Sequence, residues 1–196
     1  MLLFERGVFG FCFQNEFEMA FTNRPAEAAK KMTADTRPWA LRPAKPSDLL
    51  TVNRVIESAI HTWELPARVK RLSVPLYRYS EHDLDYLDLV VAEAESTGIV
   101  GVAAWEQADT DDAPAGHSAL LLHGIYVAPD QHHKGVGRRL FGAAEMAASL
   151  RGFDGVLVKA HPGAGDFFRA LGLQRLPVQD DRRDYPHRFW KSLKDH

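Results

Sequence analysis

Hydrophobic and polar positions divide the chain at about residue 37 into two unequal parts. Beyond that point, short apolar runs alternate with longer stretches in which apolar residues recur every three or four positions. The first pattern is typical of strands and the second of helices. Strands are predicted over residues 39–42, 87–94, 99–107, 118–127, 155–160 and 187–193. Helices are predicted over residues 48–59, 65–72, 135–150 and 163–172.

The order of these elements predicts the fold class. Two strands separated by "STG" form a hairpin, a third strand follows, and helices then alternate with strands. This order predicts a mixed sheet with helices on its faces, in an α/β (α+β) domain. One apolar stripe of the helix at 135–150 should face the sheet. It comprises Val136, Leu140, Ala143, Ala147 and Leu150.

We expect residues 1–36 to be an N-terminal extension and residues 37–196 to form the domain. The opening "MLLFERGVFGFCFQNEFEMAF" is apolar and aromatic but carries Glu5, Arg6 and Glu16. These charges argue against a signal peptide or a membrane span. Its aromatic side chains need cover from the domain or from a second subunit, so a homodimer is a possible arrangement.

Charge and cysteine content narrow the choice of partners. The net charge is −2, so no overall field attracts nucleic acid or an anionic membrane, and we expect neither as a partner. The single cysteine excludes an intrachain disulfide and a cysteine-rich zinc site, and we expect no metal. A cytoplasmic location is the expectation. Because the net charge is small, any attraction for anions must come from a local group of residues.

Glycines and positive charges gather in "GIYVAPDQHHKGVGRRL", where a predicted strand gives way to a predicted helix. The first turn of a helix has free N–H groups and a partial positive charge. Gly135 and Gly137 would let a ligand approach that backbone closely. The segment therefore predicts a phosphate cradle, although glycines chosen only for turn geometry remain an alternative. It lacks a Walker A loop, and Leu140 breaks the dinucleotide fingerprint.

The segment "YVAPDQHHKGVGRRLFGAAE" is similar to the acetyl-coenzyme A binding segment of the GCN5-related N-acetyltransferase (GNAT) family. That family's signature is Q/R-x-x-G-x-G/A after V-x-P. "GAGDFFRALGL" and "WALRPAKPSDL" also resemble GNAT segments, and the resemblance covers about residues 38–193 in order. It implies a mostly antiparallel central sheet with helices on both faces and splayed central strands. It also implies an acyltransferase that uses acetyl-coenzyme A (acetyl-CoA) to acetylate an amine.

The resemblance implies a set of residues that bind acetyl-CoA. They are Ile125, Tyr126, Val127, His132, His133, Lys134, Gly135, Val136, Gly137, Arg138, Arg139 and Phe168. Backbone groups near Ile125 and Val127 would pair with the pantetheine arm. His132 and His133 would face the pyrophosphate. Two positions depart from the family pattern, because His132 stands at the Q/R position and Phe168 at the tyrosine proposed to reprotonate the thiolate.

The implied reaction is direct attack of a primary amine of a small molecule or a protein on the thioester. His123 is our candidate for the base that removes the amine proton, since imidazole titrates near neutrality. Glu106 is a second, weaker candidate at the acceptor site. Because Phe168 has no proton to give, water or Tyr126 would serve as the acid. Each of these side chains has an alternative role in packing or orienting the sheet.

The segment "HTWELPARVKRLSVPLYRY" is expected to shape the amine site. Trp63, Tyr77 and Tyr79 could form an aromatic wall, and Glu64 could attract a cationic amine. Packing is the alternative role for each of them. The alternative for the whole protein is a catalytically weak module that binds or senses acyl-CoA, suggested by Phe168.

Overall fold

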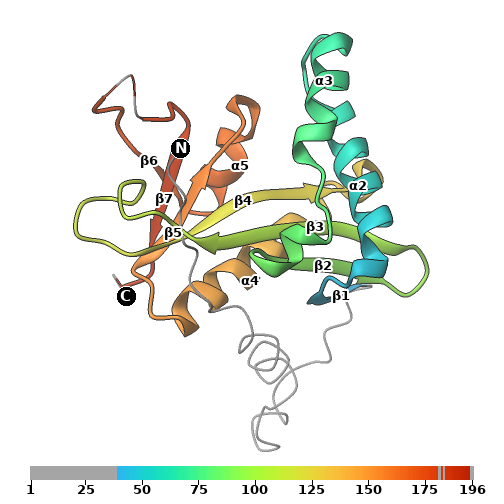
Figure 1. Ribbon diagram of the computed structural model, residues 1–196, viewed down its shortest axis with the longest axis horizontal. Helices are drawn as coiled ribbons and strands as arrows, with labels where there is room; N and C mark the ends of the chain where they lie inside the picture. The colour runs from blue at the N-terminus through green and yellow to red at the C-terminus, as the bar shows by residue number, and fades with distance from the viewer. Residues whose placement is uncertain (1–38, 181, 183, 195–196) are drawn as a thin grey trace, which may run out of the picture. The chain divides into compact units, whose positions relative to one another are not determined.

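A computed structural model describes residues 39–194, with the exception of 181 and 183. The extension expected at residues 1–36 lies outside the described residues. The described part contains a sheet with the strand order β1-β2-β3-β4-β5-β7-β6 (Figure 1). Strands β4 and β5 are parallel, and all other neighbours are antiparallel. The strands are β1 (Trp39–Pro43), β2 (Asp88–Ala94), β3 (Gly98–Gln107), β4 (Ala119–Val127), β5 (Gly155–Lys159), β6 (Gln174–Arg175) and β7 (Arg188–Ser192).

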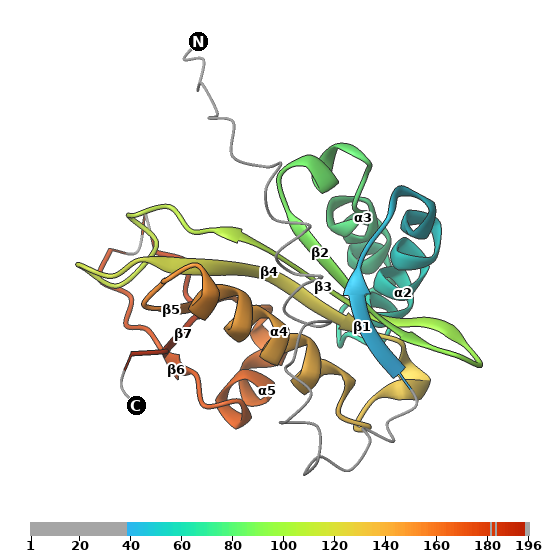
Figure 2. The same cartoon turned by 90° about the horizontal axis from the view of Figure 1, so that it is seen from below.

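Helices cover both faces of this sheet. Helices α2 and α3 lie on one face, and α4 and α5 lie on the other (Figure 2). The α-helices are α2 (Leu49–His61), α3 (Ala67–Tyr77), α4 (Val136–Leu150) and α5 (Gly165–Ala170). Short 3-10 helices are η2 (Pro46–Asp48), η3 (His82–Asp85), η4 (Pro129–Gln131) and η5 (Pro162–Ala164). The mixed, mostly antiparallel sheet with helices on both faces is therefore confirmed.

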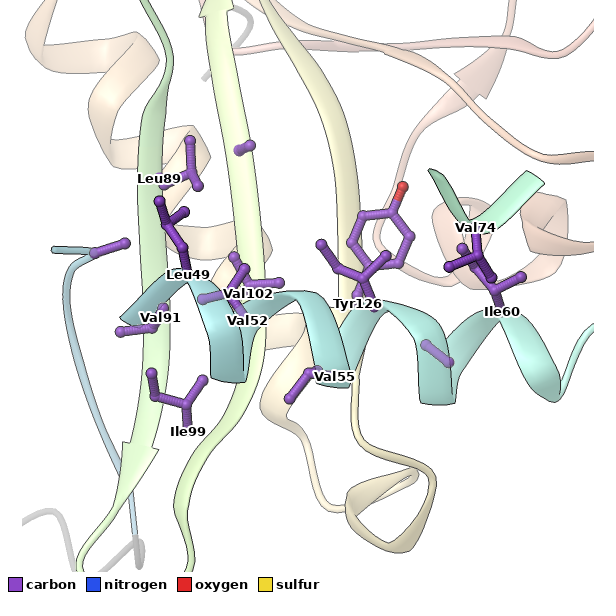
Figure 3. Close-up of a cluster of buried hydrophobic side chains, with 14 residues drawn as sticks. Leu49, Val52, Val55, Ile60, Val74, Leu89, Val91, Ile99, Val102 and Tyr126 are labelled. Atoms are coloured by element: carbon purple, nitrogen blue, oxygen red, sulfur yellow. The ribbon is translucent and has the colours of Figure 1, made fainter. Parts of the chain in front are cut away.

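Two apolar helix faces build the core. Helix α2 packs Val52, Ile56 and Ile60 against alternate residues of β2 and β3, as Figure 3 shows for part of this cluster. Helix α4 covers the opposite face, where Val136 lies so close to Gly101 that a Cβ on this glycine would be 2.9 Å from Val136 Cγ1. Glycine in β3 thus brings the first turn of α4 directly onto the sheet.

The structure differs from the predicted elements at three places. Helix α3 continues to Tyr77, well past residue 72, although Val74 is its only buried residue. Leu150 is exposed, because it is the last residue of α4 and lies beyond the edge of the apolar stripe. Strand β6 was not predicted, since its two residues are exposed and show no alternation.

Strands β4 and β5 separate halfway along their length. Their pairing ends at Leu122 and Val158, while β4 continues along β3 as far as Val127. The register of β3 and β4 shifts where Ala104 faces Gly124 and Trp105 faces Leu122, which makes His123 an extra, bulged residue. A bulge bends its strand and changes its twist. The splayed central strands expected from the GNAT resemblance are thus present, with His123 where they part.

Candidate functional site

Beyond the bulge, one edge of β4 pairs with no strand, and we call it the free edge. Within it, the carbonyl of Val127 accepts a hydrogen bond from the His132 side chain. Ala128 donates to the carbonyl of Val100 in β3. Because hydrogen-bonded and non-bonded positions alternate in an antiparallel pair, the backbone groups of Ile125 and Val127 face away from β3, into the gap. Strand β5 no longer pairs with β4 at this level. An extended chain with amide groups could therefore bind here as an added strand.

The turn that follows β4 presents a run of free amides. His133 and Gly135 both have left-handed backbone conformations, with φ of 61° and 88°. Within the described residues, the backbone N–H groups from His133 to Arg138 donate to no protein acceptor, whereas that of Arg139 donates to the carbonyl of Gly135. Left-handed residues followed by a helix N-terminus curve such amides into an anion-binding concavity. We call residues 133–138 the amide cradle.

Gly137 brings the amide cradle next to the free edge of β4. A Cβ added to Gly137 would lie 3.1 Å from Phe167 and 3.8 Å from Ile125. Phe167, which is 39% exposed, is therefore the ring that lies next to the cradle. Phe168, which we predicted to bind acetyl-CoA, is only 5% exposed, and its ring lies 6.1 Å from that of Phe189 in the core. Consecutive residues of a helix point in different directions, so only one of the two rings can face the cradle.

The charged side chains around the amide cradle spread in different directions. Lys134 and Arg138 are exposed, with hydrogen bonds to the side chain of Gln131 at 3.3 Å and to the carbonyl of Ala170 at 3.4 Å. The guanidinium of Arg139 lies over the ring of Trp39, 5.4 Å from the centroid, and its role in binding acetyl-CoA stays a prediction. This cation–π contact directs it toward β1.

The histidines of the turn occupy two different positions. His132 bonds through Nε2 to the carbonyl of Val127 at 2.9 Å, so its ring supports the end of β4. His133 is exposed, and the two rings are 6.3 Å apart. Among the residues that the structure describes, no group of three or more histidine, cysteine, aspartate and glutamate residues could hold a metal ion.

His123 and Glu106 come together on the other face of the sheet. His123 Nε2 lies 2.8 Å from Glu106 Oε1, and each side chain is about one-third exposed. A carboxylate bonded to one ring nitrogen fixes the orientation of the imidazole. The two residues are 17 positions apart, yet the bulge at His123 brings them into direct contact.

Tyr126 lies beside this pair on the same face. It is 7% exposed and belongs to the cluster under α2, with its hydroxyl oxygen pointing away from that helix (Figure 3). Its ring covers Gly124, where a Cβ would come within 2.9 Å of the hydroxyl oxygen. Burial raises the pKa of Tyr126, so its hydroxyl keeps its proton well above neutral pH.

A row of four aromatic rings borders the gap on this face. The ring of Tyr77 lies 6.3 Å from Tyr126 and 5.4 Å from Trp63. Trp63 in turn stacks on His161 at 4.4 Å. We call Trp63, Tyr77, Tyr126 and His161 the aromatic row. Glu64 is exposed next to Trp63. Within the part of the chain that the structure describes, it forms no hydrogen bond with the aromatic row.

Three residues of the site were not among the predicted ones. Phe167 was expected only to share the packing with Phe168, and the 3.6-residue period does not reveal which of two adjacent aromatics is buried. Gly124 and His161 had weak signals: a glycine inside a strand, and a histidine just after a buried strand. The sequence gives no register between distant strands, so neither signal could be interpreted.

Comparison with known proteins finds one family model that matches part of the chain. Residues 85–175 match the family model described as acetyltransferase (GNAT) domain. This range contains the bulge, the free edge of β4, the amide cradle and helix α5. No curated protein sequence matches the chain significantly.

Solved GNAT structures have the same fold. PaiA N-acetyltransferase from Thermoplasma acidophilum, in complex with coenzyme A, matches 80% of this chain and 99% of its own at 14% identity, with a TM-score of 0.65. A GCN5-related N-acetyltransferase from Rhodopseudomonas palustris matches 83% and 100% at 21% identity, with a TM-score of 0.59. A GNAT acetyltransferase from Brucella melitensis, in complex with acetyl-CoA, matches 79% and 88% at 19% identity, with a TM-score of 0.52.

Within the described residues, no helix is long and apolar enough to cross a membrane. The family match and the shared fold agree with the free strand edge and the amide cradle. Residues 85–175 therefore match the GNAT acetyltransferase domain, and the described part of the chain has the fold of solved GNAT acetyltransferases.

Proposed function

We propose that this protein is an N-acetyltransferase that transfers the acetyl group of acetyl-CoA to a primary amine. The observation that carries the proposal is the amide cradle beside the free edge of β4, joined through Gly137 and Ile125. The cradle would bind the pyrophosphate, and the backbone of Ile125 and the N–H of Val127 would pair with the pantetheine arm, while the carbonyl of Val127 accepts from His132. Two of the solved GNAT proteins of similar fold are complexes with coenzyme A or acetyl-CoA.

The amine would approach from the opposite face, where the bulge holds His123 and Glu106. His123 accepts the proton of the amine, and the carboxylate of Glu106 stabilises the imidazolium that forms. The amine nitrogen then bonds to the carbonyl carbon of the thioester, the carbon–sulfur bond breaks, and a second proton leaves the nitrogen and passes through water to the thiolate. Positioning both reactants at the gap removes much of the entropic barrier, so no covalent enzyme intermediate is needed.

Tyr126 assists the departure of the thiolate. Its hydroxyl lies over Gly124 where β4 and β5 part. Because burial raises the pKa of Tyr126 above its usual value, it is a weaker acid than a thiol with a pKa of about 8.5. Tyr126 therefore donates a hydrogen bond to the thiolate, and water delivers the proton.

The second candidate is a module that binds acyl-CoA and transfers the acetyl group only slowly. Phe168 is the observation that favours it, since this ring is buried and lacks the hydroxyl of the family's tyrosine. In that case the cradle and the free edge would still bind acyl-CoA, and the face with His123 and Glu106 would bind no amine.

Calorimetry with acetyl-CoA, followed by a thiol-release assay, tests the proposal. The amine panel contains a simple alkylamine, an arylalkylamine, a polyamine and a lysine peptide. We expect heat of binding and thiol release with at least one amine. Binding without thiol release across the panel would favour the slow module. Absence of binding at millimolar acetyl-CoA would overturn both.

A further inference from the structure

His161 follows β5 at the level where β4 and β5 have parted. The parallel register pairs Leu122 with Val158, so the residues after Lys159 lie across the gap from the end of β4. Ala160 donates to the carbonyl of His187 and accepts from the hydroxyl of Tyr185. This loop is thus tied to the β7 side of the sheet, while helices α2 and α3 belong to the other side of the gap.

The ring of His161 joins these two sides. It stacks on the indole of Trp63 with centroids 4.4 Å apart and an angle of 21° between the planes. Trp63 follows the end of α2, and its edge contacts the ring of Tyr77 at the end of α3. The aromatic row therefore reaches from β4 through both helices to the loop after β5.

A backbone hydrogen bond holds the imidazole in place. Nδ1 of His161 accepts from the N–H of Gly163 at 3.2 Å. This bond places the ring proton on Nε2 and keeps the ring neutral. Burial, with the nearby His187, lowers the pKa of His161, in agreement with that assignment.

Helix α3 depends on such contacts at its ends. Val74 is its only buried residue, Leu72 and Leu76 are exposed, and Pro75 interrupts its hydrogen bonding. An element with so little buried apolar surface opens easily on its own. The contact of Trp63 with His161 connects this part of the molecule to the loop after β5, which is hydrogen-bonded to Tyr185 and His187.

We propose that His161 is a positioning residue of the amine site: its stack on Trp63 orders the aromatic row across the gap. The inference rests on the proposed function, in which the amine binds on this face. Loss of the stack should weaken binding of the amine and leave the amide cradle on the opposite face undisturbed.

Three variants separate stacking from other roles of the side chain. His161→Ala removes the ring, His161→Phe retains a ring that can stack, and Trp63→Phe removes the reporter indole. With the panel amine of highest kcat/KM, His161→Ala should raise the amine KM about 3- to 10-fold, the range of an aromatic pair contact. The acetyl-CoA KM should stay within about twofold, and His161→Phe should restore the amine KM.

Acrylamide quenching of tryptophan fluorescence provides a readout that needs no turnover. The difference between wild type and Trp63→Phe isolates the emission of Trp63 from that of the other three tryptophans. Quenching of Trp63 should increase in His161→Ala and return to the wild-type value in His161→Phe. The contact of His117 with Trp190 is retained in every variant, so it does not affect the comparison.

Unchanged quenching in His161→Ala would overturn this inference alone. Equal changes in the two KM values, or failure of His161→Phe to restore the amine KM, would do the same. Absence of thiol release by the wild-type protein would instead contradict the proposed function, and the positioning role with it.

Discussion

The two faces of the β4–β5 gap differ in composition: one presents mainly backbone groups and the other mainly side chains. On the α4 side, the site consists mainly of backbone: the edge of β4 and the free amides that precede and open α4. On the α2 side, it consists of side chains from distant elements, among them His123 with Glu106 and Trp63 with His161. The backbone face suits a ligand of constant chemistry, whereas the side-chain face can change without altering the fold.

This contrast implies that substitutions on the two faces should affect different steps. A change at the amide cradle should reduce acetyl-CoA binding, because it alters the backbone surface itself. A change at His123 or its neighbours should reduce turnover or amine binding and leave acetyl-CoA binding intact. The following substitutions test this separation, beginning with the largest expected effect.

Gly137→Asp should weaken acetyl-CoA binding by about 100-fold or more, equivalent to about 3 kcal/mol. The new side chain would collide with Phe167 and place a negative charge among the amides of the cradle. Calorimetry measures the effect. Gly142→Asp is the matched control, since a Cβ at Gly142 in the same helix meets no atom within 4 Å. Equal losses in both variants would mean that helix α4, not the cradle, was damaged.

His123→Ala should lower kcat/KM by about 100-fold, the lower range for loss of a general base. The loss should be greatest at low pH, where the amine holds its proton, and acetyl-CoA affinity should stay nearly unchanged. The pH–rate profile of the variant against wild type is the measurement. A profile with its shape unaltered would refute the role of His123 as base.

Glu106→Gln should have a smaller effect on the same step, about 10-fold in kcat, because the amide can still contact the ring but cannot stabilise imidazolium. The measurement is kcat of wild type and variant with the same amine. A change confined to the amine KM would assign Glu106 to amine binding.

Tyr126→Phe should lower kcat only about 3- to 10-fold, since one neutral hydrogen bond to the leaving thiolate is lost. The ring and its cover over Gly124 remain, so the free energy of unfolding should change little. Thiol release with a thioester of lower thiol pKa provides the discriminating measurement. The defect should shrink for such a leaving group, and an undiminished defect would exclude assistance to the thiolate.

Asp48→Asn tests how much the ion pair with Arg42 contributes to the free energy of unfolding, at a residue outside both faces of the site. Arg42 bonds both oxygens of Asp48, at 2.6 and 3.1 Å, and also pairs with Glu93. Arg42 and the backbone N–H of Lys45 hold the pKa of Asp48 below its usual value. The substitution should therefore cost about 1 kcal/mol of unfolding free energy at pH 7.

Because the pKa of Asp48 is lowered in the folded state, its contribution is present above the unfolded value of about 4. It should disappear as the pH falls through the folded value. Chemical denaturation of wild type and variant at several pH values measures the difference. If the difference in unfolding free energy between wild type and variant persists at the lowest pH, the carboxylate charge is not its origin.

The backbone face was largely predictable, because its signals are local. Gly135, Gly137 and the basic residues around them follow one strand and open one helix, so adjacent sequence positions are also neighbours in space. The sequence did not determine which side chains around the cradle point toward it. Phe167 rather than Phe168 lies there, and Arg139 turns to Trp39, because contacts with other strands determine these directions.

The side-chain face was predictable only in part. His123, Glu106, Trp63, Tyr77 and Tyr126 were candidates as individual residues, but their mutual contacts follow from a bulge and a register that no local pattern encodes. His161 was not a candidate, since the contact with Trp63 spans about half of the chain.

Local alternation, helical periodicity and glycines in a turn were enough to predict every described strand except β6, most of the helices and the amide cradle. Each of these depends on interactions between near neighbours in the chain. The meeting of His123 with Glu106, the aromatic row and the burial of Phe168 required the folded sheet. They depend on register and packing between distant segments, which arise only when the whole core forms.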